Sequence, residues 1–275
     1  MLRTRALTAA IGLTLFLSAL FLLPKSGWVA FCAAILAVAA WEWGGLAGFA
    51  AMGRGAYSAL VVAIFVSPEF IQVAQRDGLQ MPFDAYYASA LFWMILVPIW
   101  LWWRPRVGPV LMLAAGVIAL VPAFAALVDL RGFVGPTQLL AVLAIVWISD
   151  SAAYLVGGTF GKHKLAPSIS PGKTWEGVLG ALIAVIVYAP AWVEIGGPES
   201  LPDRLRRISG DAGWFIALLV GLAVVGMIGD LFESLIKRQA GVKDSGTLLP
   251  GHGGMLDRID APMAMLPLAV LAFIK

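Results

Sequence analysis

Cysteine and histidine are scarce in this sequence, which has one cysteine and two histidines among its 275 residues. Cys32 stands alone in an apolar run, so an internal disulfide bond is excluded and the residue is expected to be a small buried hydrophobe. His163 and His252 have no histidine or cysteine neighbour at metal-ligand spacing, so a zinc site is not expected. Other side chains must therefore supply any chemistry.

Charge is scarce as well. Only 13% of the residues are charged while 61% are hydrophobic, a balance that excludes a soluble domain of this length. Apolar runs of about 20 residues recur along the chain, and this length crosses a hydrocarbon core of ~30 Å. The sequence therefore predicts an all-α, polytopic integral membrane protein. A net charge of +3 gives no argument for binding nucleic acid.

The apolar runs predict about nine transmembrane helices, the first of which follows Arg3 and Arg5. No small-residue cleavage site occurs between that first run and Pro24, so we expect a retained span rather than a signal peptide. The predicted spans cover residues 6–23, 27–49, 56–74, 85–103, 108–128, 136–157, 176–196, 212–232 and 261–275.

Lysine and arginine are distributed unevenly between alternate loops. With the N-terminus inside, 12 of the 19 Lys and Arg residues fall on the inner side and 7 on the outer side. The positive-inside rule therefore favours a cytoplasmic N-terminus. This orientation also places the two most polar loops, residues 158–175 and 233–260, together on the cytoplasmic side.

The most polar stretch runs from Asp230 to Asp260, between two apolar segments. Dense charge of both signs beside bilayer spans is typical of a functional site. A continuing helix would place four polar residues on one face, at i, i+3, i+4 and i+7: Asp230, Glu233, Ser234 and Lys237. After Gly241, further glycines predict a compact loop whose backbone N–H groups can approach an anion. Carboxylates suit Mg²⁺ and basic groups suit phosphate, so the stretch predicts a site for a metal–nucleotide complex.

A second polar stretch covers residues 147–177. Asp150 lies inside an apolar run, where an ionisable group is expected to face the protein interior with a partner or a cation. Ser170, Lys173 and Thr174 precede the next predicted helix, whose free N–H groups and dipole make a phosphate seat. A Walker A loop is excluded, because Pro167 stands where that motif needs glycine.

Residues 234–260 resemble the signature of the phosphatidate cytidylyltransferase (CDP-diacylglycerol synthase) family. The matching residues are Ser234, Lys237, Arg238, Lys243, Asp244, Gly246, Pro250, His252, Gly253, Gly254, Asp257, Arg258 and Asp260. The second stretch is similar to the same family through Asp150, Ala153, Tyr154, Gly161, Lys162, Ser170, Pro171, Lys173, Thr174, Glu176 and Gly177. The N-terminal half matches only in being apolar.

The resemblance implies that CTP and phosphatidic acid react to give CDP-diacylglycerol and pyrophosphate, with Mg²⁺ as cofactor and a second cation left open. The expected metal ligands are Asp230, Asp257, Asp150 and Asp260. The expected catalytic residues are Asp230, Asp257, Lys243 and Arg258. The nucleotide is expected to contact Ser170, Lys173, Thr174, Lys237, His252, Gly253 and Gly254.

On this interpretation, residues 1–135 form a lipid-facing scaffold and residues 136–275 form the catalytic membrane region. We expect a bacterial-type inner or plasma membrane location, with the site at the cytoplasmic face. The expected partners are CTP, phosphatidic acid and membrane lipid, without nucleic acid, and a homodimer is left open. Two alternatives stay open: a CTP-dependent polyprenol or dolichol kinase, and a transporter of an anionic solute.

Overall fold

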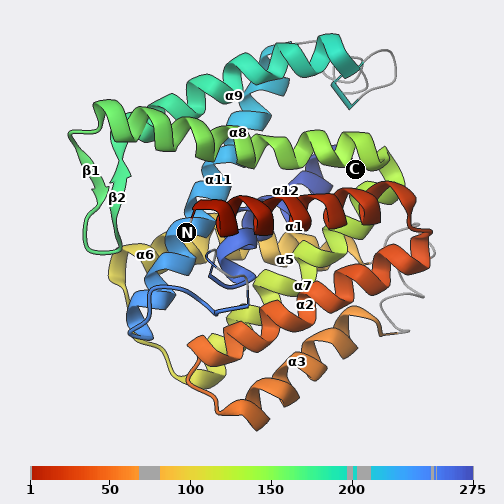
Figure 1. Ribbon diagram of the computed structural model, residues 1–275, viewed down its shortest axis with the longest axis vertical. Helices are drawn as coiled ribbons and strands as arrows, with labels where there is room; N and C mark the ends of the chain where they lie inside the picture. The colour runs from red at the N-terminus through yellow and green to blue at the C-terminus, as the bar shows by residue number, and fades with distance from the viewer. Residues whose placement is uncertain are drawn as a thin grey trace.

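The computed structural model describes residues 2–67, 81–196, 201–202, 212–248, 251 and 253–274. The elements within these ranges are mostly helices, as the sequence predicts (Figure 1). Their bounds are α1 Leu2–Leu22, α2 Lys25–Leu46, α3 Ala51–Phe65, α5 Phe83–Leu91, the π-helical turn η1 Phe92–Leu96, α6 Val97–Trp103, α7 Pro109–Val134, α8 Pro136–Phe160, α9 Trp175–Gly196, α11 Ala212–Gln239 and α12 Leu256–Phe273.

Six helical segments of the described residues are long and apolar enough to cross a membrane. They are Lys25–Leu46, Phe83–Trp103, Pro109–Val134, Pro136–Phe160, Trp175–Glu194 and Gly213–Gln239. This confirms an all-α protein with the composition of a membrane protein. The count of nine stays a prediction, because Leu7–Leu22 and Ala51–Phe65 are shorter apolar helices and the first five residues of α12 include three charged ones. The predicted third span, 56–74, runs into residues outside the description.

The loop predicted over residues 158–175 contains a small antiparallel hairpin. Strand β1, Lys164–Ala166, pairs with β2, Ser170–Thr174, with Lys164 opposite Thr174 and Ala166 opposite Ser170. The hairpin stands beyond the ends of α8 and α9, at the left of Figure 1. The chain after α11 turns back at the same end of the molecule. The two polar loops therefore lie near each other.

Helix α7 is the most deeply buried of the six candidate spans. Two aromatic side chains fix the neighbouring helices against it: Trp43 Nε1 of α2 donates to the Met112 carbonyl at 2.8 Å, and the Tyr57 hydroxyl of α3 donates to the Leu113 carbonyl at 2.9 Å. Gly116 lies directly under both side chains, where a Cβ atom would collide with them. A residue without a side chain is therefore needed at this crossing.

Phe232 anchors α11 within the core. Its ring packs against four aromatic rings, with centroid separations of 5.3–6.5 Å: Trp43, Phe92, Trp93 and Trp100. Phe232, Trp43 and Trp93 are completely buried. Because Phe232 immediately precedes Glu233, this packing fixes the part of α11 that carries the polar face.

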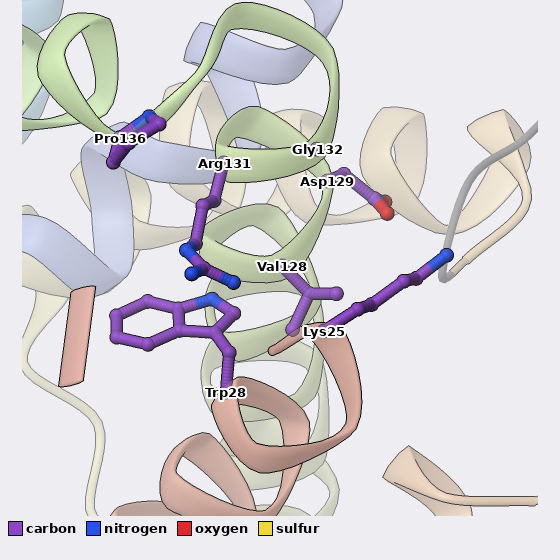
Figure 2. A pocket seen from close by; sticks show the side chains of 7 residues that line it. All are labelled: Lys25, Trp28, Val128, Asp129, Arg131, Gly132 and Pro136. Carbon is purple, nitrogen blue, oxygen red and sulfur yellow. The ribbon is translucent and has the colours of Figure 1, made fainter. Parts of the chain in front are cut away.

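A cavity of about 140 Å³ lies at the end of α7, where α7 meets α2 and the start of α8. Figure 2 shows the side chains that line it. The Arg131 guanidinium lies 5.3 Å from the Trp28 ring centre. It donates to the carbonyl of Leu20, in the last turn of α1, and to that of Leu23, directly after α1. A cation at a helix C-terminus interacts favourably with the helix dipole. Arg131 therefore joins α1, α2 and α7, and the cavity lies at the other end of α7 from Met112.

The crossing at Gly116 can be tested with two alanine variants of α7. Gly116→Ala should lower the unfolding free energy by about 1–3 kcal/mol, because the added methyl group overpacks the contact with Trp43 and Tyr57. Gly132→Ala is the matched control, since nothing lies within 4 Å of its added Cβ. Thermal unfolding in detergent should show a lower midpoint for Gly116→Ala alone. Equal midpoints would refute the packing described for α7.

Candidate active site

Lys173 and Asp230 join the two polar stretches. Lys173 lies on β2 and Asp230 lies on α11, and their Nζ and Oδ2 atoms are 2.6 Å apart. Both side chains are about one-quarter exposed. The Ser234 hydroxyl, one turn along α11, lies 3.4 Å from the other carboxylate oxygen of Asp230. The two polar stretches therefore meet, as predicted, and a direct ion pair joins them.

Lys237 forms a second ionic group further along the same face of α11. Its ammonium nitrogen lies 2.5 Å from Glu233 Oε2 and 2.5 Å from Asp257 Oδ1. The side chains are 12%, 0% and 7% exposed respectively, so three charges are held almost out of solvent. Asp257 belongs to the first turn of α12, so Lys237 ties the end of α11 to the start of α12.

Asp257 accepts two backbone hydrogen bonds at its Oδ2 atom, from the Ser245 N–H at 3.0 Å and from the Gly254 N–H at 2.7 Å. The Ser245 hydroxyl also lies 3.0 Å from this atom. Burial by itself would raise the pKa of the Asp257 carboxyl group, but the hydrogen bonds from Lys237 and Gly254 outweigh it and hold the pKa below its ordinary value. Asp257 is therefore an anion that is fixed in place.

Asp150 and Asp260 add two carboxyl groups to the same region. Asp260 interacts electrostatically with Asp230, Glu233 and Asp150. Asp150 on α8 also interacts with Asp230 and Lys173. Four of these five acids come from two helices, α11 and α12, whose charged ends meet. The arrangement concentrates negative charge between α8, α11 and α12.

Contacts from two other parts of the chain hold the hairpin over this region. Arg104, just after α6, donates from Nη1 to the Ser168 hydroxyl at 2.7 Å. Arg238 of α11 donates from Nε to the Ile169 carbonyl at 3.3 Å. Ile169 itself is buried. The turn of the hairpin is therefore fixed, and with it the position of Lys173.

The remaining predicted residues take different places. Lys243 and Arg258 are exposed, and Ser170 is half-buried on β2. Thr174 is buried, and its hydroxyl accepts a hydrogen bond from the Gly177 N–H at 3.1 Å, so it caps the start of α9. Gly253 and Gly254 lie beside Asp257, whereas His252 lies outside the described residues. The nucleotide contacts assigned to these residues stay predictions.

A divalent cation fits this region by charge, although within the described ranges no three His, Cys, Asp or Glu side chains are grouped closely enough to hold a metal ion. The ammonium groups of Lys173 and Lys237 contact Asp230 and Asp257. Glu233 is fully buried, and its Oε1 atom has no hydrogen-bond partner among the described atoms. A buried carboxylate oxygen without a donor favours a cation or a proton beside it. The excess of carboxylates over ammonium groups therefore suits Mg²⁺.

The chain matches the model of the cytidylyltransferase family over residues 3–274. The chain belongs to the cytidylyltransferase family. It is similar to the phosphatidate cytidylyltransferase of Pseudomonas aeruginosa, with 37% identity over 97% of this chain and 95% of that protein. The protein of the same name from Haemophilus influenzae is 40% identical over 66% of this chain and 60% of its own length. The one from Thermotoga maritima is 38% identical over half of each chain.

The structure adds two acids to the site that the sequence-based assignment of this cytidylyltransferase left out. Glu233 was expected on the polar face of α11 but was not assigned to the metal, although it is the most deeply buried acid of Lys237's ionic group. Glu42 of α2 is 4% exposed, and it accepts hydrogen bonds from the Ser245 hydroxyl and from the N–H groups of Met255 and Leu256. A single acid within an apolar run was the only signal for Glu42.

Removing the charge of Lys237 should destabilise the protein strongly. Lys237→Met leaves Glu233 and Asp257 buried without their shared cation, which is expected to reduce the unfolding free energy by about 3–5 kcal/mol. Lys164→Met, at an exposed position on β1, is the control and should change it by less than about 0.5 kcal/mol. Thermal unfolding of both variants without substrates gives the comparison. A Lys237→Met midpoint no lower than that of the control would contradict this role of Lys237.

Proposed function

We propose that this protein is a phosphatidate cytidylyltransferase, a nucleotidyltransferase of phospholipid synthesis. It transfers CMP from CTP to phosphatidic acid and yields CDP-diacylglycerol and pyrophosphate. The observation that carries the proposal is the 37% identity to a protein of this name over 97% of the chain. The charge-dense region between α8, α11 and α12 supports it, because both substrates are polyanions.

The reaction depends more on stabilising negative charge than on general-base catalysis. An oxygen of the lipid phosphate, already anionic near neutral pH, attacks the α-phosphorus of CTP. A bond forms between that oxygen and the phosphorus, and the bond from the α-phosphorus to the bridging oxygen breaks as pyrophosphate leaves. Basic side chains stabilise the negative charge at both ends of this exchange. We assign the phosphate contacts to Lys173, Lys243 and Arg258.

Mg²⁺ is the proposed cofactor, and when bound it would neutralise the phosphate oxygens. Its proposed ligands are Asp230 and Asp257, with Asp150, Asp260 and the buried Glu233 completing the acidic set. Lys173 and Lys237 hold Asp230 and Asp257 until substrates arrive. The nucleotide is assigned to Ser170, Thr174, Lys237, His252, Gly253 and Gly254.

The enzyme is proposed to span a bacterial-type inner or plasma membrane about nine times, with its N-terminus and active site at the cytoplasmic face. The excess of Lys and Arg on that side supports this orientation. Phosphatidic acid enters between helices with its tails in the bilayer. Asp150, which was expected to face the protein interior, is exposed on α8 together with Tyr154, and this accessible side of α8 supports the route.

The products from labelled CTP test the proposed reaction. With purified protein, phosphatidic acid and Mg²⁺, label at the α-phosphate should appear in lipid and label at the γ-phosphate should appear in pyrophosphate. A reaction without phosphatidic acid is the control and should release neither product. Label from the γ-phosphate in lipid, together with CDP, would instead indicate a lipid kinase. Nucleotide-independent uptake of an anionic solute into liposomes, without either product, would indicate a transporter.

The metal assignment predicts a specific pair of defective variants. Asp230→Asn and Asp257→Asn should each lower kcat/KM by about 100-fold or more at limiting Mg²⁺, because each removes an anionic ligand. Glu194→Gln, an exposed acid near the end of α9, is the matched control and should stay within about twofold of the unsubstituted enzyme. Near-full activity of both aspartate variants at limiting Mg²⁺ would overturn the assignment.

A further inference from the structure

Glu42 is the only acidic residue of α2, and it lies far from the polar stretches in sequence. Its carboxylate is almost fully buried and accepts three hydrogen bonds. Oε1 accepts from the Met255 N–H at 2.9 Å, and Oε2 accepts from the Leu256 N–H at 2.9 Å and from the Ser245 hydroxyl at 3.0 Å. The donors come from the loop after α11 and from the start of α12.

This carboxylate caps α12 from another helix. The first N–H groups of a helix have no hydrogen-bond partner within the helix. The side chain of Met255, which precedes α12, does not accept a hydrogen bond from them. Glu42 accepts from the N–H groups of Met255 and Leu256, and its negative charge also interacts favourably with the helix dipole. The start of α12 is therefore fixed by α2.

Asp257 lies in the same first turn, one residue after Leu256. The Ser245 hydroxyl lies 3.0 Å from Glu42 Oε2 and 3.0 Å from Asp257 Oδ2, so one side chain contacts both carboxylates. Any shift of the α12 N-terminus would move Asp257 relative to Lys237 and Asp230. Glu42 thus acts on Asp257 through two routes, the capped backbone and Ser245.

Glu42 also explains why two positions of the loop after α11 are occupied by glycine. A Cβ atom at Gly246 would lie 2.5 Å from Glu42 Oε1, and its three nearest neighbours would all be atoms of the Glu42 side chain. A Cβ atom at Gly254 would lie 2.5 Å from Glu42 Oε2 and would also collide with Ser245. Real side chains do not approach so closely. The loop therefore wraps around this one carboxylate and leaves room for no side chain at either position.

We infer that Glu42 is a positioning residue of the active site, which holds Asp257 in place for the cation by anchoring the start of α12 and the loop around Ser245 and Gly254. An N-terminal helix thereby takes part in building the site. The anchoring is a property of the fold. Only the link to the cation rests on the proposed function.

A double-variant cycle between Glu42 and Gly246 tests the anchoring without substrates or metal. Gly246→Ala should lower the thermal unfolding midpoint in detergent by roughly 3–10 °C, because its methyl group meets Glu42. Glu42→Ala should also lower the midpoint, but Gly246→Ala should have little further effect in that background. Additive losses would overturn the proposed contact. If Glu42→Ala yields no folded protein, Glu42→Asp serves in the same cycle, since it withdraws the carboxylate by one methylene group.

Binding of Mn²⁺ to the substrate-free protein tests the positioning role. Glu42→Gln keeps the side-chain volume but places an amide group against backbone donors, so the affinity for Mn²⁺ should fall at least about tenfold. Tyr57→Phe is the control. It removes a buried hydrogen bond elsewhere and should leave the affinity within about twofold.

Two other outcomes of the Mn²⁺ experiment would each contradict a different claim. A Glu42→Gln affinity equal to that of Tyr57→Phe would overturn the positioning role, because a purely structural residue lowers the midpoint without changing the affinity of the folded protein. If the unsubstituted protein binds no Mn²⁺, the cation assignment of the proposed function fails. The cycle with Gly246 then still decides the anchoring.

Discussion

Lys237 shares its charge with two buried carboxylates, and the rest of the site depends on that ionic contact. Glu233 is inaccessible to solvent and Asp257 nearly so. Burying an unpaired charge costs several kcal/mol, so the end of α11 and the start of α12 are stable only while they lie together. Glu233 lies beside Lys237 because the two are one helical turn apart, and the aromatic rings around Phe232 fix the part of α11 that carries them in the core.

The other elements complete the site around this contact. The hairpin, fixed by Arg104 and Arg238, carries Lys173 to Asp230. Helix α8 contributes Asp150 to the same field of negative charge. The site is thus built from segments that are far apart in the sequence but meet at one end of the helices. Such an arrangement can bring two polyanionic substrates together.

Much of this was predictable from the sequence. The i, i+3, i+4 and i+7 spacing gave the polar face of α11, and the end of the helical pattern near Gly241 agrees with the end of α11 at Gln239. The charge distribution placed both polar loops on one side, and the ion pair between Lys173 and Asp230 shows that they meet. These features are local or depend on charge counts, which a single sequence contains.

Other features depend on long-range packing and were missed. The hairpin was predicted only as part of the loop 158–175, because its strands of three and five residues are too short to show periodicity. Glu42 lies in a run that reads only as a membrane span, and two of its three partners are backbone N–H groups more than 200 positions away. Backbone N–H donors cannot be recognised in a sequence, so an acid within an apolar run was the only signal for Glu42.

The most direct measurement of the central claim is the position of a bound cation. Crystals of the protein with Mn²⁺ in place of Mg²⁺, measured at a wavelength where manganese scatters anomalously, would reveal it. The account predicts a peak about 2.0–2.5 Å from carboxylate oxygens of both Asp230 and Asp257, between α11 and α12. A peak held by other residues, or none in this region at a saturating concentration of Mn²⁺, would contradict it.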